Sequence, residues 1–154
     1  MTVLPPSTIV DLMLDAVCIV DANGCFEYVS PSFERIFGYA PEEVVGRRMI
    51  ELVHSEDRER TLQAAQNVMD GALQLQFENR YVRKDGQIAH IRWTARWVDD
   101  QQVRLAVAHD ITERKHAESL QAAIYSISET AQAAEDLVTL FAHVHQTIGT
   151  LLPA

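Results

Sequence analysis

The stretch Ala108-His-Asp-Ile-Thr-Glu-Arg-Lys115 marks the point where the hydrophobic pattern of this 154-residue chain changes. Before it, apolar and polar side chains alternate, which is typical of β-strands. After it, apolar side chains recur every three or four residues, which is typical of a helix. Residues 108–115 are therefore expected to join a sheet to a long helix.

Three strands are expected before this joint. The first begins at Leu73, and the turn Lys84-Asp85-Gly86 separates it from the second. The third runs from Val103 to His109. Because successive side chains of a strand point to opposite faces, one face is expected to carry Leu75, Phe77, Asn79, Tyr81, Ile91, Trp93 and Ala95.

Two further strands are expected near the N-terminus. The apolar run Ala16–Val20 and the segment around Phe26–Val29 flank Asn23-Gly24, which is a strong hairpin signal. A short helix carrying Ile9, Leu12 and Met13 is expected before them, capped by Ser7 or Thr8, and should bury this stripe on the domain or on a partner.

Between the two groups of strands, the pattern predicts short helices. Ser30 is expected to cap a helix that Gly38 ends, and Ser55 is expected to cap a longer helix from Glu56 to about Asp70. The buried face of the longer helix is predicted to hold Leu62, Ala65, Val68 and Met69. Five strands in one antiparallel sheet, with helices on one face, make an α+β architecture.

Composition narrows the functional classes. The net charge of −9 and the absence of a basic stripe argue against a nucleic-acid-binding surface. No apolar run reaches the roughly 18 residues that span a bilayer, and the first residues do not resemble a signal peptide. We therefore expect a soluble, cytoplasmic protein without membrane insertion. Cys18 and Cys25 lack metal-ligand spacing, and no metal site is predicted.

At this point the chain resembles a PAS domain, the sensory module of bacterial signalling proteins. The resemblance covers roughly residues 9–115 and rests on several short stretches in a specific order. They are Val20-Asp-Ala-Asn-Gly24, Tyr28-Val-Ser-Pro-Ser-Phe33, Phe37-Gly-Tyr39, Glu42-Glu-Val-Val-Gly-Arg47, Arg83-Lys-Asp-Gly86 and Asp110-Ile-Thr-Glu-Arg114. The resemblance implies a five-stranded PAS fold with an N-terminal cap helix, a small internal pocket and a long C-terminal signalling helix, usually in a parallel homodimer.

The tail resembles the connector and first helix of a GAF domain. We expect residues 1–8 to be an irregular lead-in, 9–115 the PAS sensor domain, and 116–154 a helical linker with the truncated start of a GAF-like domain. Apolar residues of the tail also follow a 4-3 spacing typical of a coiled coil. The predicted seam includes Leu120, Ile124, Ile127, Val138 and Phe141. The alternative is a helix that packs on its own domain.

The resemblance implies a pocket that holds haem, flavin, a small metabolite or nothing, and each ligand needs particular residues. Haem-binding relatives carry a histidine in the long helix, where Thr61 stands here, so haem is disfavoured. Photoactive flavin-binding relatives carry a cysteine where Met49 stands, which disfavours covalent flavin photochemistry. Trp93 is interpreted as a core residue rather than as a platform for non-covalent flavin. The cofactor stays unknown, and a small organic ligand or none is expected.

The pocket itself has two interpretations. The family register points Ala106 and Ala108 inward, which leaves a void beside bulky rings, whereas Phe77 and Trp93 together could fill that space. The predicted lining residues are Ile36, Leu52, Leu62, Met69, Leu75, Phe77, Asn79, Tyr81, Ile91, Trp93, Ala106 and Ala108.

No catalytic constellation stands out, and enzymatic activity is not expected within these residues. The predicted function is a signal-sensing and dimerisation module. It would pass a ligand- or state-dependent change through Asp110, Ile111 and Thr112 to a downstream output domain of histidine kinase or diguanylate cyclase type. The alternative is a ligand-free dimerisation scaffold that sets the register between neighbouring domains.

Overall fold

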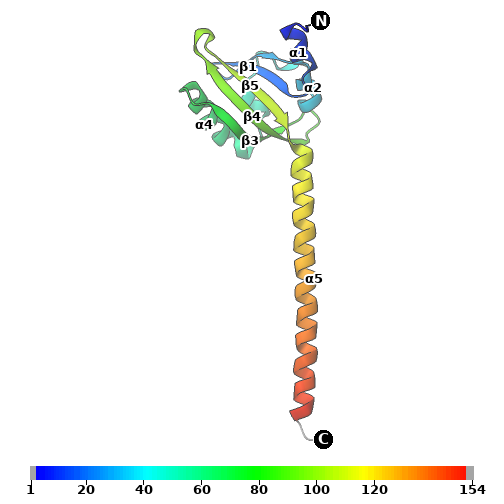
Figure 1. Ribbon diagram of the computed structural model, residues 1–154. Helices are drawn as coiled ribbons and strands as arrows, with labels where there is room; N and C mark the ends of the chain where they lie inside the picture. The colour runs from blue at the N-terminus through cyan, green and yellow to red at the C-terminus, as the bar shows by residue number, and fades with distance from the viewer. Residues whose placement is uncertain (1–2, 152–154) are drawn as a thin grey trace. The chain divides into compact units, whose positions relative to one another are not determined.

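A computed structural model describes residues 3–151 of the chain. Figure 1 labels the helices α1, α2, α4 and α5 and the strands β1, β3, β4 and β5, which are numbered along the chain. The helices are α1 (Pro6–Leu12), α2 (Ser32–Phe37), α3 (Pro41–Val44), α4 (Arg58–Met69) and α5 (Thr112–Leu151), with short 3-10 turns at Met49–Leu52 (η1), Ser55–Asp57 (η2) and Asp99–Gln101 (η3). The strands are β1 (Ala16–Asp21), β2 (Phe26–Val29), β3 (Gln74–Val82), β4 (Ile88–Val98) and β5 (Val103–Asp110).

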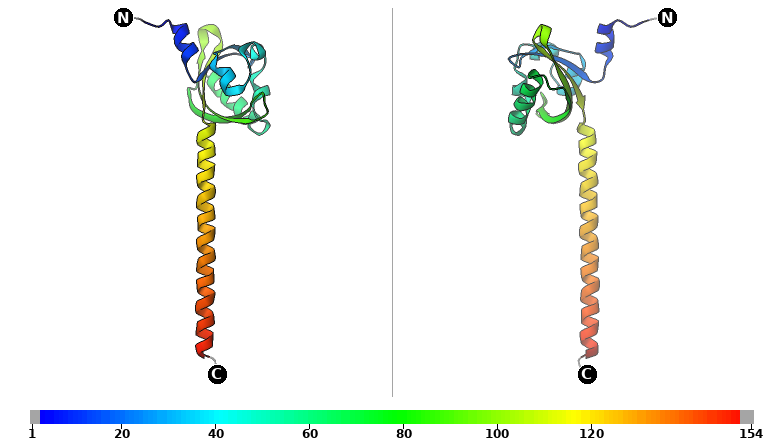
Figure 2. Two further views of the ribbon diagram at one scale, coloured as in Figure 1. Left: turned by 90° about the vertical axis from the view of Figure 1, so that its right-hand side faces the viewer. Right: turned by 60° about the vertical axis from the view of Figure 1, so that its left-hand side comes forward.

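The five strands form one sheet in the order β2-β1-β5-β4-β3, and all neighbours are antiparallel. One hydrophobic core joins the inner face of this sheet to α2 and α4 (Figure 2). Phe33, Ile36 and Phe37 enter it from α2, because residues three and four apart share a helix face. The expected α+β fold is therefore confirmed. The chain divides into two compact units, which meet between Glu113 and Arg114.

A β-bulge near the start of β3 changes which side chains face inward. Gln74 pairs with Ala95 and Phe77 with Trp93, so three steps along β3 match two along β4. An extra residue in one strand reverses the alternation of faces beyond it. As a result Leu75, predicted to face inward, has 57% of its surface exposed.

The helix caps differ from the expected ones. Ser30 is fully buried, and its Oγ accepts the backbone N–H of Val17 on β1 at 2.9 Å, so it does not cap α2. Ser55 lies in η2, and α4 begins only at Arg58. The His54 side chain accepts the N–H of Glu56 at 3.2 Å instead. Serine is a preferred residue type for a cap, but Ser30 bonds to β1 and leaves α2 without a side-chain cap, and His54 caps η2 in place of Ser55.

The N-terminal helix does not pack on the domain. It begins at Pro6, so residues 6–8, expected to be irregular, are helical, and neither Ser7 nor Thr8 caps it. It has no buried residue, and Ile9 and Leu12 are exposed. Burial of this stripe on the chain's own domain is therefore wrong. Burial on a partner stays a prediction.

Candidate functional site

A small cavity lies between the inner face of the sheet and α4. Its volume is about 50 Å³, which is room for a few water-sized groups. Apolar side chains of β1, β2, α4 and the central strands make up most of its wall. The lining residues are Cys18, Val20, Phe26, Met49, Thr61, Ala64, Ala65, Val68, Gln74, Phe77, Asn79, Tyr81, Trp93, Ala95, Arg104 and Ala106.

The predicted lining residues fall into three groups in the structure. The cavity wall includes Phe77, Asn79, Tyr81, Trp93 and Ala106. Four others are buried away from it, namely Ile36, Leu52, Ile91 and Ala108. The last three, Leu62, Met69 and Leu75, do not reach it.

Leu62 and Met69 lie outside the cavity wall because α4 presents a different face to the sheet from the one predicted. Thr61 and Val68 are its buried residues, and Ala64 and Ala65 lie between them on the same face. Each residue turns a helix by about 100°, so Leu62, one position on from Thr61, is exposed. Leu62 and Met69 instead line a second hollow of about 160 Å³ beside the β1–β2 turn.

A buried hydrogen-bond chain crosses the wall of the cavity. The indole Nε1 of Trp93 donates to Oδ1 of Asn79 at 2.9 Å, and Nδ2 of Asn79 donates to Oγ1 of Thr61 at 3.0 Å. All three side chains are buried. These hydrogen bonds therefore link β4, β3 and α4, and each of the three polar groups would destabilise the fold if it were left unpaired.

The titratable groups of the cavity are strongly desolvated. Burial raises the pKa of the Cys18 thiol and of the Tyr81 phenol, so both are neutral near pH 7. Burial lowers the pKa of the Arg104 guanidinium, which nevertheless stays protonated. Arg104 is a residue that sequence reasoning missed. The alternation that points Ala106 and Ala108 inward also points Arg104 inward, two residues earlier.

An ion pair holds the start of α4 on the sheet. Asp57 is buried, and its Oδ2 accepts both the backbone N–H and the Nε–H of Arg80 on β3, at 2.8 and 3.0 Å. Its Oδ1 accepts from Nη2 of Arg80 at 2.8 Å, which makes the pair bidentate. Hydrogen bonding to Arg80 lowers the pKa of Asp57 to about 2.

Asp57→Asn is expected to lower the free energy of unfolding by about 1–2 kcal/mol at pH 7 and to flatten its fall in acid. Folding lowers the pKa of Asp57 from 3.8 to about 2. The contribution is therefore fully present above about pH 4 and disappears as the pH falls through about 2. Urea unfolding at several pH values measures this, with the exposed Asp70→Asn as control. An equal loss at pH 7 and near pH 2 would mean that ionisation is not the source.

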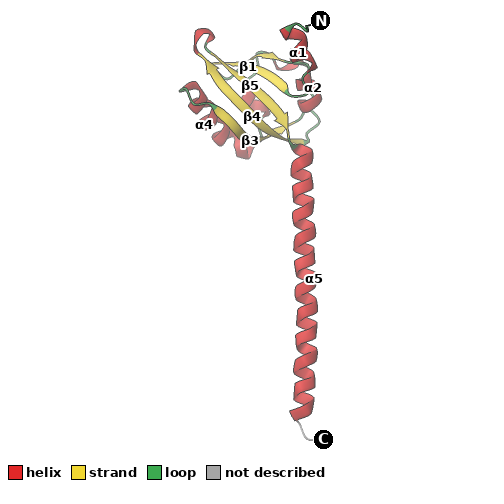
Figure 3. Ribbon diagram, viewed as in Figure 1, coloured by secondary structure: helices red, strands yellow, loops and turns green. Residues whose placement is uncertain are grey.

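The residues of the joint, Asp110, Ile111 and Thr112, are connected by hydrogen bonds within the first compact unit. Asp110 Oδ1 accepts the N–H of Thr112 at 2.9 Å, and Asp110 Oδ2 lies 3.1 Å from Nη2 of Arg83. Thr112 Oγ1 accepts the N–H of His90 at 3.0 Å, and Ile111 N–H donates to the His90 carbonyl at 2.9 Å. The end of β5 and the first residue of α5 are thus bonded to β4 (Figure 3).

Residues 3–151 contain neither a metal-binding cluster nor a membrane-spanning helix. No group of three or more His, Cys, Asp or Glu side chains in this range is arranged to hold a metal ion. None of the helices in the same range is both long and apolar enough to cross a bilayer.

Comparisons with known proteins agree with this architecture. A family model described as PAS fold matches residues 26–108, more than half of the chain. The White collar 2 protein of Neurospora crassa is 32% identical over 81 residues, which are 53% of this chain and 15% of that protein. Sensor histidine kinase TmoS of Ectopseudomonas mendocina is 24% identical over 145 residues, 88% of this chain and 15% of that protein.

Among solved structures, the PAS domain of a protein from Colwellia psychrerythraea has a TM-score of 0.63 and 22% identity, and the match covers 70% of this chain and 94% of that one. That likeness concerns the fold. The chain spans only about 15% of the length of the two curated relatives. On the family match and on the strand order of its sheet, the chain belongs to the PAS-fold family, and a sensor histidine kinase is among its relatives.

Proposed function

We propose that this chain is an intracellular sensing and dimerisation module that passes a ligand-dependent change through Asp110, Ile111 and Thr112 into α5. The observation that carries the proposal is the hydrogen-bonded joint. The strand that ends in Asp110 also carries Ala106 and Arg104 in the cavity wall. A change in the cavity that favours one position of β5 would therefore change the bonds that hold the first turn of α5.

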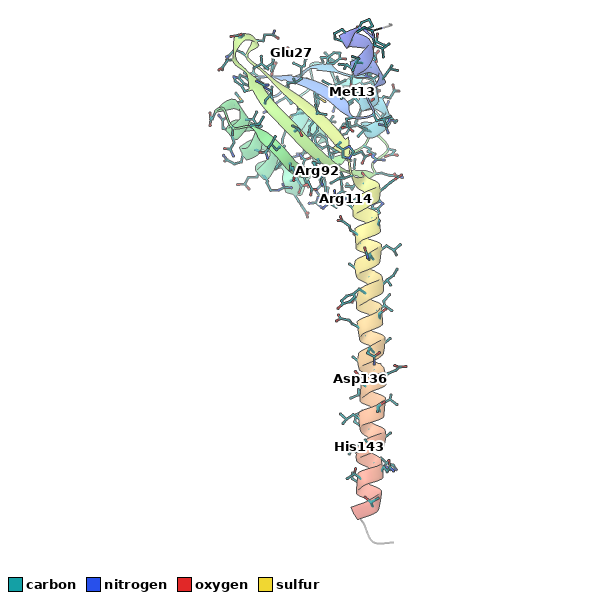
Figure 4. All side chains as sticks on the ribbon, in the orientation of Figure 1. Met13, Glu27, Arg92, Arg114, Asp136 and His143 are labelled. Carbon is teal, nitrogen blue, oxygen red and sulfur yellow. The ribbon has the colours of Figure 1, made fainter. Side chains whose placement is uncertain are left out.

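The second half of the proposal is a parallel homodimer through α5. Figure 4 draws the side chains of this helix, where Asp136 and His143 are labelled. The apolar residues of the predicted seam are all more than half exposed in the single chain, and a second copy would cover them. Those residues are Leu120, Ile124, Ile127, Val138 and Phe141.

The output of the module would lie outside this chain. The relative named a sensor histidine kinase supports a kinase output, and a diguanylate cyclase is the other output class that we propose. Catalysis belongs to that output domain and not to the residues of this chain. We propose that residues 9–115 form the sensory domain and that residues 116–154 form the linker with the start of a GAF-like domain.

Asp110→Ala is expected to abolish the response of the full-length protein to its signal, with a loss of only about 1 kcal/mol in domain stability. The substitution removes the acceptor of the Thr112 N–H and the partner of Arg83, both at the joint. The measurement is output activity with and without signal, beside a thermal melt of each protein. Asp100→Ala, an exposed residue of η3, is the matched control.

The same experiment separates the two candidate functions. A cavity of only about 50 Å³ favours the alternative, a ligand-free scaffold that sets the register between neighbouring domains. If Asp110→Ala dimerises and still responds normally, the joint is not the transmission point and our main proposal is wrong. If the wild-type protein shows no change in output under any condition while remaining a dimer, the scaffold is the better description.

A further inference from the structure

Arg104 is a buried cation in the wall of the cavity. It lies on β5, two residues before Ala106, and only 6% of its surface is exposed. The alternation of β5 directs it to the same side of the sheet as Ala106 and Ala108, toward α4 rather than to the outer face. Its side chain lines the cavity together with Tyr81 and Trp93.

No carboxylate within residues 3–151 forms an ion pair with this guanidinium. Its side-chain hydrogen-bond acceptor in the structure is the thioether sulfur of Met49, 2.8 Å from Nη2. Asp21 lines the neighbouring hollow, but its Oδ1 accepts the backbone N–H groups of Asn23 and Cys25. A thioether is a weak acceptor, and a buried charge without an opposite charge is costly. Among residues 3–151, Arg104 therefore has no ion-pair partner for its buried charge.

The surroundings of Arg104 define the kind of anion that would fit. Arg104 and Met49 line both the cavity and the second hollow, so these two residues border both spaces. Arg48 adds a positive charge on the side of the hollow. On the other side, the cavity wall is mostly apolar, with Phe26 and Val68 among its residues. An anionic group would meet Arg104, and an apolar body would meet the cavity wall.

We propose that this cavity binds a small carboxylic acid, as its carboxylate, with Arg104 as the anion-binding residue and the apolar wall around the rest of the molecule. A guanidinium forms two parallel hydrogen bonds with a carboxylate, which a thioether cannot accept. The small volume restricts the ligand to a short aliphatic acid, because a cavity that holds an aromatic ring is about 150 Å³. This inference names the ligand class of the proposed sensor and rests on that function for its biological meaning.

Thermal unfolding of this chain with propionate and butyrate tests the proposal directly. At a concentration about 100 times its dissociation constant, a bound acid should raise the Tm by about 5–10 °C. Propionamide and butyramide have nearly the same shape without the charge and should leave the Tm unchanged. Inorganic phosphate at equal ionic strength should also have no effect, since it has no apolar body.

Two matched variants locate the site. Arg104→Met should abolish the rise in Tm caused by the acids, and without ligand it should melt at the same or a higher temperature, because a desolvated charge is replaced by an apolar group of similar length. Arg96→Met makes the same change at an exposed position of β4 and should respond like the wild type.

Three results would overturn the proposal. They are the absence of any rise with propionate or butyrate in the wild type, an equal rise with phosphate, and a full response of Arg104→Met. None of these measurements uses the output domain, whereas the Asp110→Ala test does. Failure of ligand binding and failure of signal transmission are therefore distinguishable.

Discussion

Phe37→Ala is expected to lower the free energy of unfolding by about 3–5 kcal/mol. Phe37 is fully buried, and its ring centroid lies 4.3 Å from that of Phe33, 5.1 Å from that of Tyr81 and 6.3 Å from that of Trp93. Truncation would remove the ring that joins α2 to both β3 and β4. It would leave a void that three surrounding aromatic rings cannot fill without leaving their preferred geometry.

Urea unfolding of wild type and variant measures this loss. A typical domain is stable by only about 5–15 kcal/mol, so a loss of this size would be a large fraction of the total. Phe37→Leu should lose less than half of the unfolding free energy that Phe37→Ala loses. Tyr28→Ala removes an aromatic ring that is 38% exposed and should cost about 1 kcal/mol or less. A loss below 1 kcal/mol for Phe37→Ala would show that this cluster does not hold α2 on the sheet.

The second large effect is expected at the hydrogen-bond chain of the cavity. Asn79→Ala should lower the free energy of unfolding by about 2–4 kcal/mol, because it leaves the Trp93 indole N–H and the Thr61 hydroxyl without their partner. Loss of the amide also enlarges the cavity, so part of the cost comes from packing. The fluorescence of Trp93 should change as well, since its N–H loses its acceptor.

A double substitution separates these contributions. In Asn79→Leu with Trp93→Phe, the indole N–H and the amide are both absent, and apolar replacement of both partners is often nearly neutral. The pair should therefore be more stable than the sum of the two single losses predicts. Asn67→Ala removes an exposed amide of α4 and should change stability by about 0.5 kcal/mol or less. If the loss in the double variant equals the sum of the two single losses, the buried hydrogen bonds are not the source of the lost stability.

The sequence predicts those parts of the fold that depend on local hydrophobic periodicity and on glycine at helix ends. The strand β1 was expected at Ala16–Val20 and spans Ala16–Asp21, and the helix α2 ends at Gly38 as predicted. Gly38 has a φ of 82°, a conformation that glycine adopts without strain. Alternation also identified Asn79, Tyr81 and Trp93 as inward-facing residues, and all three are buried.

The remainder depended on tertiary context that a local pattern does not contain. The bulge before Phe77 is defined by pairing with β4, so Leu75 could not be recognised as outward-facing from β3 alone. The face of α4 was misjudged because Thr61, a polar residue, is buried through its bond to Asn79, while the apolar Leu62 is exposed. Arg104 was missed because a cation is seldom buried without an opposite charge.

The length of α5 has a consequence for which sequence changes this helix can tolerate. Each residue advances a helix by about 1.5 Å and rotates it by about 100°, so the 40 residues of α5 determine both the distance and the rotational phase at which any following segment begins. Loss of a single residue would turn that segment by more than a quarter of a circle, whereas gain or loss of seven residues would nearly restore the phase. We therefore expect α5 to tolerate substitutions better than insertions or deletions, and insertions of whole heptads better than insertions of other lengths.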